Sequence, residues 1–103
     1  MVKIGKPKQL ADLFDKIRKC LDQQKYTQTK HALQRQKERE IDLWDAVYVL
    51  NTGYHEKRKT SFDDVNNTWK YAVRGKTIEN VDLRIIVAFD EEDMIIITVI
   101  EVT

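Results

Sequence analysis

The chain is poor in the residues that mark several large protein classes. It has three glycines, one proline and one cysteine among 103 residues, which excludes collagen-like and linker-like segments. The single cysteine, Cys20, excludes an intramolecular disulfide framework and a cysteine-based zinc site. The longest apolar run, Met94–Ile100, is interrupted by Thr98 and is far too short to span a bilayer. The basic N-terminus has no apolar segment behind it, so we expect no signal peptide and a cytoplasmic protein.

What is present is enough for one folded domain. Apolar residues make up 42% of the chain and charged residues 34%, which supplies a core and argues against disorder. The net charge of +1 hides an asymmetry, because residues 1–40 carry eleven Lys and Arg against five Asp and Glu. Residues 41–103 carry seven against twelve. A basic first half can attract phosphates or an acidic partner, or its cations can simply solvate helix surfaces.

The first half of the chain has helical periodicity. A second helix should begin near Thr27 or Thr29, either of which can cap it. A third should begin at Asp42 and end at Gly53 in a left-handed conformation. A first helix is predicted by apolar residues that recur at intervals of three and four and form its buried stripe, namely Leu10, Leu13, Phe14, Ile17, Cys20 and Leu21.

After Gly53 the pattern alternates as in strands. The polar segment 54–61 is expected at a sheet edge, and the acidic turn Asp90–Asp93 should join the last two strands in an antiparallel hairpin. The strands that alternation predicts cover residues 69–74, 81–89 and 94–102. We therefore predict an α+β fold, in which two to three N-terminal helices pack on a three- to four-stranded antiparallel sheet. Residues 1–103 should form a single domain, with 1–25 as a helical addition to a core of 26–103.

Three residues of the second predicted helix suggest phosphodiester chemistry. His31, Arg35 and Arg39 are spaced by four, which places them along one helical face if the helix continues through Arg39. Guanidinium groups can hold a phosphate bidentately, and an imidazole can move a proton near neutral pH. The alternative is an exposed helical face with a partly packed histidine.

The predicted sheet offers a second basic cluster. If Val73 pairs with Leu83, then Lys70, Arg74 and Arg84 lie together on the face opposite the apolar residues. Such a face can guide a nucleic-acid backbone. Cys20 lies on the predicted buried stripe, so we interpret it as a core thiol. We interpret Asp90–Asp93 as a solvated turn rather than a cation site. No metal-binding or cofactor motif is present, so we expect neither a metal nor a cofactor.

The spacing of these residues also carries a family resemblance. The series His31, Arg35, Arg39, Ile41, Val47, Leu50 and Gly53, together with the closing strand Ile96–Ile100, resembles a family of small uncharacterised bacterial domains. The resemblance covers about residues 26–103. That family is distantly similar to the BrnT-like and RelE/ParE-like toxins of bacterial toxin–antitoxin pairs, in which helices pack on a small antiparallel sheet.

The resemblance implies a toxin-like domain that binds RNA and has an antitoxin protein as its partner. Several such toxins are metal-independent endoribonucleases. By analogy His31 would act as acid or base, Arg35 and Arg39 would hold phosphate, and Lys70, Arg74 and Arg84 would guide the RNA. The rival interpretation is a non-catalytic domain that uses the same scaffold to bind a protein or nucleic acid.

Overall fold

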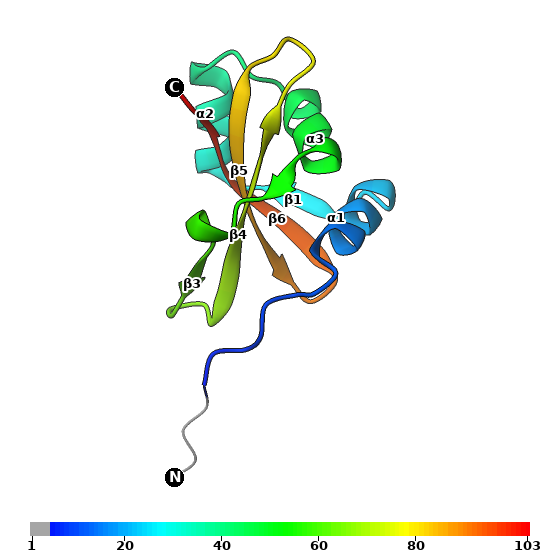
Figure 1. Ribbon diagram of the computed structural model, residues 1–103, viewed down its shortest axis with the longest axis vertical. Coiled ribbons are helices and arrows are strands. Elements are labelled where there is room, and N and C mark those ends of the chain that lie inside the picture. Colours follow the sequence, from blue (N-terminus) through cyan, green and yellow to red (C-terminus); the bar gives the residue numbers. More distant parts are fainter. Residues whose placement is uncertain (1–4) are drawn as a thin grey trace.

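The computed structural model describes residues 5–103 (Figure 1). These residues form three α-helices, a short 3-10 helix and six strands. In chain order the elements are α1 (Leu13–Asp22), β1 (Tyr26–Gln28), α2 (Lys30–Glu38), α3 (Leu43–Thr52), β2 (Tyr54–His55), η1 (Lys57–Lys59), β3 (Ser61–Asp63), β4 (Thr68–Lys76), β5 (Asp82–Asp90) and β6 (Asp93–Glu101). None of the helices described is long and apolar enough to cross a membrane.

The sheet is mostly antiparallel, in the order β1-β6-β5-β4-β2, with β3 also paired to β4. The pair β1–β6 is parallel, while the remaining pairs are antiparallel. Segments β2 and β3 lie along β4 as a short edge strand that η1 interrupts. A bulge shifts the register between β5 and β6 after Ile86. The α+β class is confirmed, but the expected three to four strands are too few.

The two extra strands were missed because they are short and polar. β1 covers only three residues and has no alternation of apolar side chains to reveal it. Its pairing depends on β6, almost seventy residues later. The polar segment 54–61 does lie at the edge as predicted, but it divides into β2 and β3 on either side of η1.

Two helix starts follow the sequence signals. The Thr29 hydroxyl caps α2 by accepting a hydrogen bond from the Ala32 N–H at 3.0 Å. Asp42 caps α3 in a reciprocal capping box with Asp45. The expected left-handed Gly53 is wrong, because its φ of −78° and ψ of −170° are extended. Glycine is needed there for space, since a Cβ atom would lie 2.5 Å from the Arg74 carbonyl oxygen.

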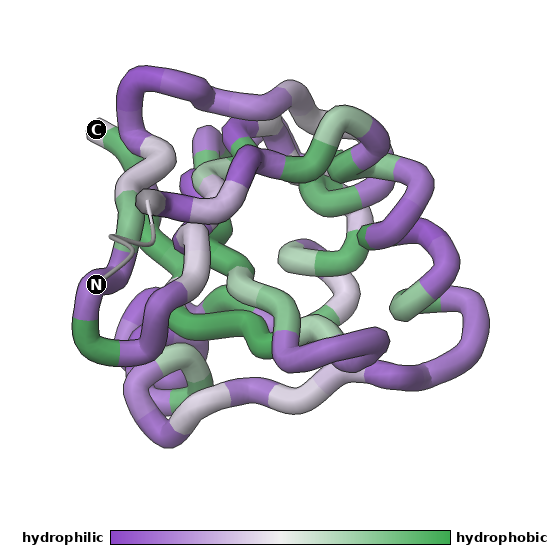
Figure 2. The backbone as a smooth tube through the Cα atoms, turned by 90° about the horizontal axis from the view of Figure 1, so that it is seen from below, coloured by the Kyte–Doolittle hydropathy of each residue, from purple (hydrophilic) through white to green (hydrophobic). Residues whose placement is uncertain are grey.

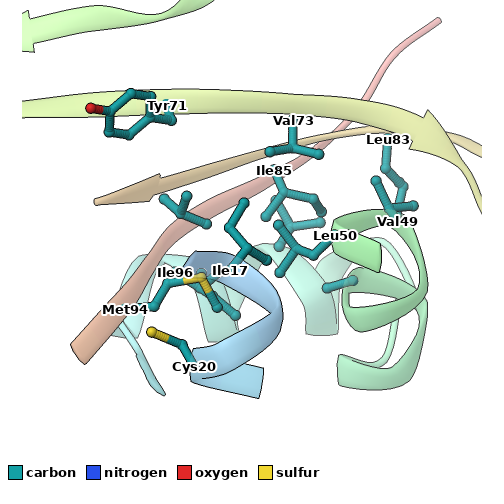
Figure 3. Close-up of a cluster of buried hydrophobic side chains, with 14 of the residues drawn as sticks. Ile17, Cys20, Val49, Leu50, Tyr71, Val73, Leu83, Ile85, Met94 and Ile96 are labelled. Atoms are coloured by element: carbon teal, nitrogen blue, oxygen red, sulfur yellow. The ribbon is translucent and has the colours of Figure 1, made fainter. Parts of the chain in front are cut away.

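The core lies between α1, α3 and one face of the sheet. Ile17 of α1 and Leu50 of α3 are fully buried, and both point toward the strands (Figure 3). The side chains of Val73, Leu83 and Ile85 approach them from the sheet. Figure 2 shows hydrophobic segments in the centre of the molecule and hydrophilic segments along its outer loops. Of the α1 residues expected inside, Phe14 and Leu21 are only partly buried.

The other sheet face carries the basic residues, with a register different from the one expected. Val73 pairs with Ile85, not with Leu83, and Arg74 lies directly opposite Arg84. The difference is two residues, which keeps every side chain on its predicted face because strands alternate with period two. We call this face, which bears Arg74 and Arg84, the open face. α1 and α3 pack on the opposite face (Figure 1).

Candidate functional site

Helix α2 displays the predicted catalytic residues on one flank. Ala32 and Gln36 are buried and fix the rotation of the helix against the rest of the domain. His31 is exposed and Arg35 is half-buried. The regular helix ends at Glu38, and Arg39 is its C-cap, with φ of −101° and ψ of 3°, but the Arg39 N–H still donates to the Arg35 carbonyl at 3.1 Å as in a helical turn. The four-residue spacing therefore does place all three on the same side of α2.

The cations of this flank are available to a ligand. Among residues 5–103, neither Arg35, Arg39 nor His31 makes an ion pair within 4.0 Å. The nearest acid in the helix, Glu38, accepts a hydrogen bond from Gln34 at 3.0 Å. We call His31, Arg35 and Arg39 the α2 row.

The two arginines of the open face have a different environment. Glu56, which is 5% exposed, accepts hydrogen bonds from both of them. The Arg84 Nε lies 2.5 Å from Glu56 Oε1, and the Arg74 Nη1 lies 2.8 Å from Glu56 Oε2. Arg74 also donates two hydrogen bonds to the Asp82 carboxylate, from Nε at 2.8 Å and from Nη2 at 2.7 Å. Two carboxylates thus balance two guanidiniums, and we call these four residues the ion network.

The network shifts the titration of its acids. Hydrogen bonds from Arg84, and then from Arg74, lower the pKa of Glu56 to about 2 against the opposing effect of burial. The hydrogen bonds from Arg74 likewise lower the pKa of Asp82. Both carboxylates are therefore charged at neutral pH. Arg74 and Arg84 lie together on one face of the sheet, as predicted. Their guanidiniums, however, already donate hydrogen bonds to carboxylates of the protein.

Glu56 and Asp82 were not singled out in the sequence. Glu56 is the only acid in the basic run His55–Lys59, which lies within the polar segment expected at a sheet edge. A usable signal did exist, because like charges directly opposite each other on a sheet are destabilising unless an acid lies between them. Two arginines predicted on one face thus call for a carboxylate nearby.

Lys70, the third predicted sheet cation, lies at a groove of about 550 Å³. The groove crosses the ends of β4, β5 and β6 and extends to the turn after β3. Thr29, the N-cap of α2, lines it too, and the Thr29 hydroxyl donates to the Ile97 carbonyl of β6 at 2.7 Å. This groove therefore brings Lys70 to the beginning of the helix that carries the α2 row. His31 itself does not line the groove.

Two other reactive side chains are held by packing. The His55 Nε2 lies 2.8 Å from the Thr60 hydroxyl, and its ring meets Tyr71 edge-on at 5.8 Å. Burial, together with the neighbouring Lys57, lowers the pKa of His55. Cys20 is buried as expected, and burial raises the pKa of its thiol. Within residues 5–103, no three His, Cys, Asp or Glu side chains gather closely enough to hold a metal ion.

Comparison with known proteins identifies the family. The model of the domain of unknown function DUF4258 matches residues 28–101. The chain belongs to this family. The DUF4258 match takes in the α2 row, the ion network and the groove residues, whereas α1 precedes it even though Ile17 is fully buried in the core. No curated protein and no solved structure matches the chain.

Proposed function

We propose that this DUF4258 domain binds RNA through the α2 row and cleaves it without a metal ion. The observation that carries the proposal is an imidazole and two guanidiniums on one exposed flank with no acid paired to them among residues 5–103. The ion network shows the contrasting case, in which arginines serve the fold. Lys70 at the groove is the sheet cation that remains to contact the RNA.

The chemistry requires two proton transfers and stabilisation of the negative charge that develops on the phosphate. Neutral His31 would take the proton of a ribose 2′-hydroxyl, whose oxygen then attacks the adjacent phosphorus. The bond to the 5′-oxygen breaks, that oxygen takes a proton from water, and a 2′,3′-cyclic phosphate remains. Arg35 and Arg39 would hold the phosphate and stabilise the negative charge that develops on it. Helical spacing allows this, because residues four apart have Cβ atoms about 6 Å from each other.

The resemblance to BrnT-like and RelE/ParE-like toxins supports the same function, since several of these are metal-independent ribonucleases. On that analogy an antitoxin protein would be the partner of this chain. The rival proposal is a domain that binds a protein or nucleic acid without turnover. The exposed Trp44 of α3, at 71% of its full accessibility, is the feature that favours protein binding.

Cleavage of a defined RNA oligonucleotide in the presence of a chelator tests this proposal. We expect products with 2′,3′-cyclic phosphate and 5′-hydroxyl ends, and a rate at least about 100-fold lower for His31→Ala. Binding of the RNA by His31→Ala should be nearly unchanged. The matched control is His55→Ala, which removes the packed histidine and should lower stability while sparing cleavage by the folded protein.

Salt dependence separates the two proposals. Two contacts to phosphates of single-stranded RNA, from Arg35 and Arg39, predict that affinity falls about sevenfold between about 50 and about 200 mM salt. Binding that is absent or independent of salt would favour the protein-binding domain. Undiminished cleavage by His31→Ala from a nuclease-free preparation would rule out the catalytic role of His31.

A further inference from the structure

The groove on the open face combines an apolar floor with charged rims. Its floor is formed by Ala88, Ile95 and Ile97, and Lys70 and Asp90 line it from the adjacent strands β4 and β5. Asp63 lines it from the turn side. The volume of about 550 Å³ lies in the range of small-molecule sites.

The charges of the groove argue against a phosphate as its occupant. Two carboxylates, Asp63 and Asp90, face one ammonium, Lys70, so the groove is acidic on balance. A neutral ligand with several N–H donors and a few acceptors could form hydrogen bonds with the carboxylates and with the ammonium. A nucleobase has this composition, and its flat apolar faces suit a floor of aliphatic side chains.

The two carboxylates are not equivalent. Asp63 already accepts hydrogen bonds from the Val65 and Asn66 backbone N–H groups and from the Asn66 side chain, at 3.0, 3.3 and 2.8 Å. Its role is to hold the turn between β3 and β4. Asp90 makes no ion pair within 4.0 Å among residues 5–103. Because no cation of the described residues pairs with it, the Asp90 carboxylate is the one of the two that can serve a ligand.

We propose that this groove binds a guanine base, with Asp90 and Lys70 as the residues that select it. Guanine is the base that offers two adjacent donors, N1–H and the N2 amino group, to the two oxygens of one carboxylate. Its O6 and N7 acceptors match a lysine ammonium. Adenine lacks the paired donors, and the pyrimidines offer one donor group each to the carboxylate.

The groove also lies where a base next to the reacting phosphate would be. Thr29 lines the groove, and His31 follows two residues later, so their Cα atoms are at most about 7 Å apart. The inference rests on the proposed function in this respect. It names guanine as the base that the RNA presents beside the α2 row.

Binding of free nucleosides to the full chain, followed by amide NMR shifts, tests base recognition apart from RNA. We expect guanosine to shift the Ile95, Ile97 and Lys70 resonances. Inosine lacks the N2 amino group and should bind about tenfold more weakly, and adenosine should be weaker still. This series needs no substitution, so a variant that fails to fold cannot obscure it.

Two pairs of variants assign the selectivity to residues. Asp90→Asn should abolish the preference for guanosine over inosine, while Glu91→Gln, at the next position and also exposed, should retain it. Lys70→Gln should weaken guanosine binding, while Lys76→Gln, on the same face of β4 but away from the groove, should not. The RNA counterpart is a set of oligonucleotides with a single guanosine, inosine or adenosine, in which cleavage should map to the guanosine.

Each outcome has a separate meaning. Equal affinity for guanosine and inosine, or selectivity that survives Asp90→Asn, would overturn the guanine site and leave RNA binding by the α2 row intact. Selective guanosine binding without any binding of RNA would instead overturn the proposed function and leave a nucleoside site in the groove.

Discussion

The α2 row and the ion network contain the same kind of side chain in opposite circumstances. Arg35 and Arg39 lie on a helix with no acid paired to them among residues 5–103, whereas Arg74 and Arg84 are bound by Glu56 and Asp82. In the network the partners lie 18, 28 and 8 residues apart in the chain. The comparison shows that a basic surface is available to a ligand only where the fold brings no carboxylate to it.

The largest effect we expect on stability comes from breaking the ion network. Glu56→Gln removes the buried charge between two arginines and leaves Arg84 without its carboxylate, which should lower the free energy of unfolding by about 3 kcal/mol. Denaturant titration measures it. Glu79→Gln, in the exposed loop before β5, is the control and should change stability little. RNA affinity of the folded Glu56→Gln protein should not fall, and a strong loss would mean that the network itself binds RNA.

Lowering the pH should reveal the same contribution of Glu56 to stability. The pKa of Glu56 in the folded protein is about 2, below its ordinary value, so the folded state favours the charged form. The resulting stabilisation is complete above the ordinary pKa and is lost as the pH falls toward 2, on the order of 3 kcal/mol in all. Unfolding measured between pH 5 and pH 2 should therefore be less sensitive to pH in Glu56→Gln. An unchanged slope would show that Glu56 does not contribute in this range.

For a substitution in the α2 row we expect the opposite result, namely a loss of RNA affinity with little change in stability. Arg35→Ala should weaken RNA binding roughly tenfold and lower the salt slope by about 0.7, because one phosphate contact is lost. Unfolding should be little affected, since Arg35 holds no carboxylate among residues 5–103. Arg35→Lys should restore only part of the affinity, because an ammonium cannot reproduce the guanidinium fork. Arg18→Ala, which removes an exposed arginine from α1, should leave binding unchanged; an equal loss there would point to nonspecific attraction.

The sequence predicted features that depend on near neighbours and missed those that depend on distant ones. The caps Thr29 and Asp42 could be recognised because each acts on an N–H three residues away. The two arginine partners of Glu56 lie on β4 and β5, far away in the chain, and the Arg74 carbonyl that leaves no room for a Cβ atom at Gly53 is also on β4. Register was off by two because apolar alternation constrains the face of a strand but not its position along the neighbour. The groove depends both on the face that each strand presents and on its position along its neighbour. No local pattern of residues therefore predicted it.

The smallest effect concerns the end of α2, where geometry and charge can be separated. Glu40 follows Arg39 with φ of 55°, a left-handed conformation that glycine adopts without cost. Around it the Ile41 N–H donates to the Gln36 carbonyl at 2.9 Å, which closes the helix in the way that usually favours glycine. Glu40→Gly should therefore raise the free energy of unfolding by about 0.5–1 kcal/mol.

Glu40→Gly also removes a negative charge beside Arg39, so its effect on RNA needs a matched variant. Glu40→Gln keeps the backbone strain and removes the same charge. If Arg39 holds phosphate, both variants should bind RNA slightly more tightly, and only Glu40→Gly should be more stable. A gain in affinity confined to the glycine variant would mean that rigidity of the helix end, rather than the charge near Arg39, limits binding. Equal affinities in all three proteins would remove Arg39 from the contact surface, and the α2 row would then reduce to His31 and Arg35.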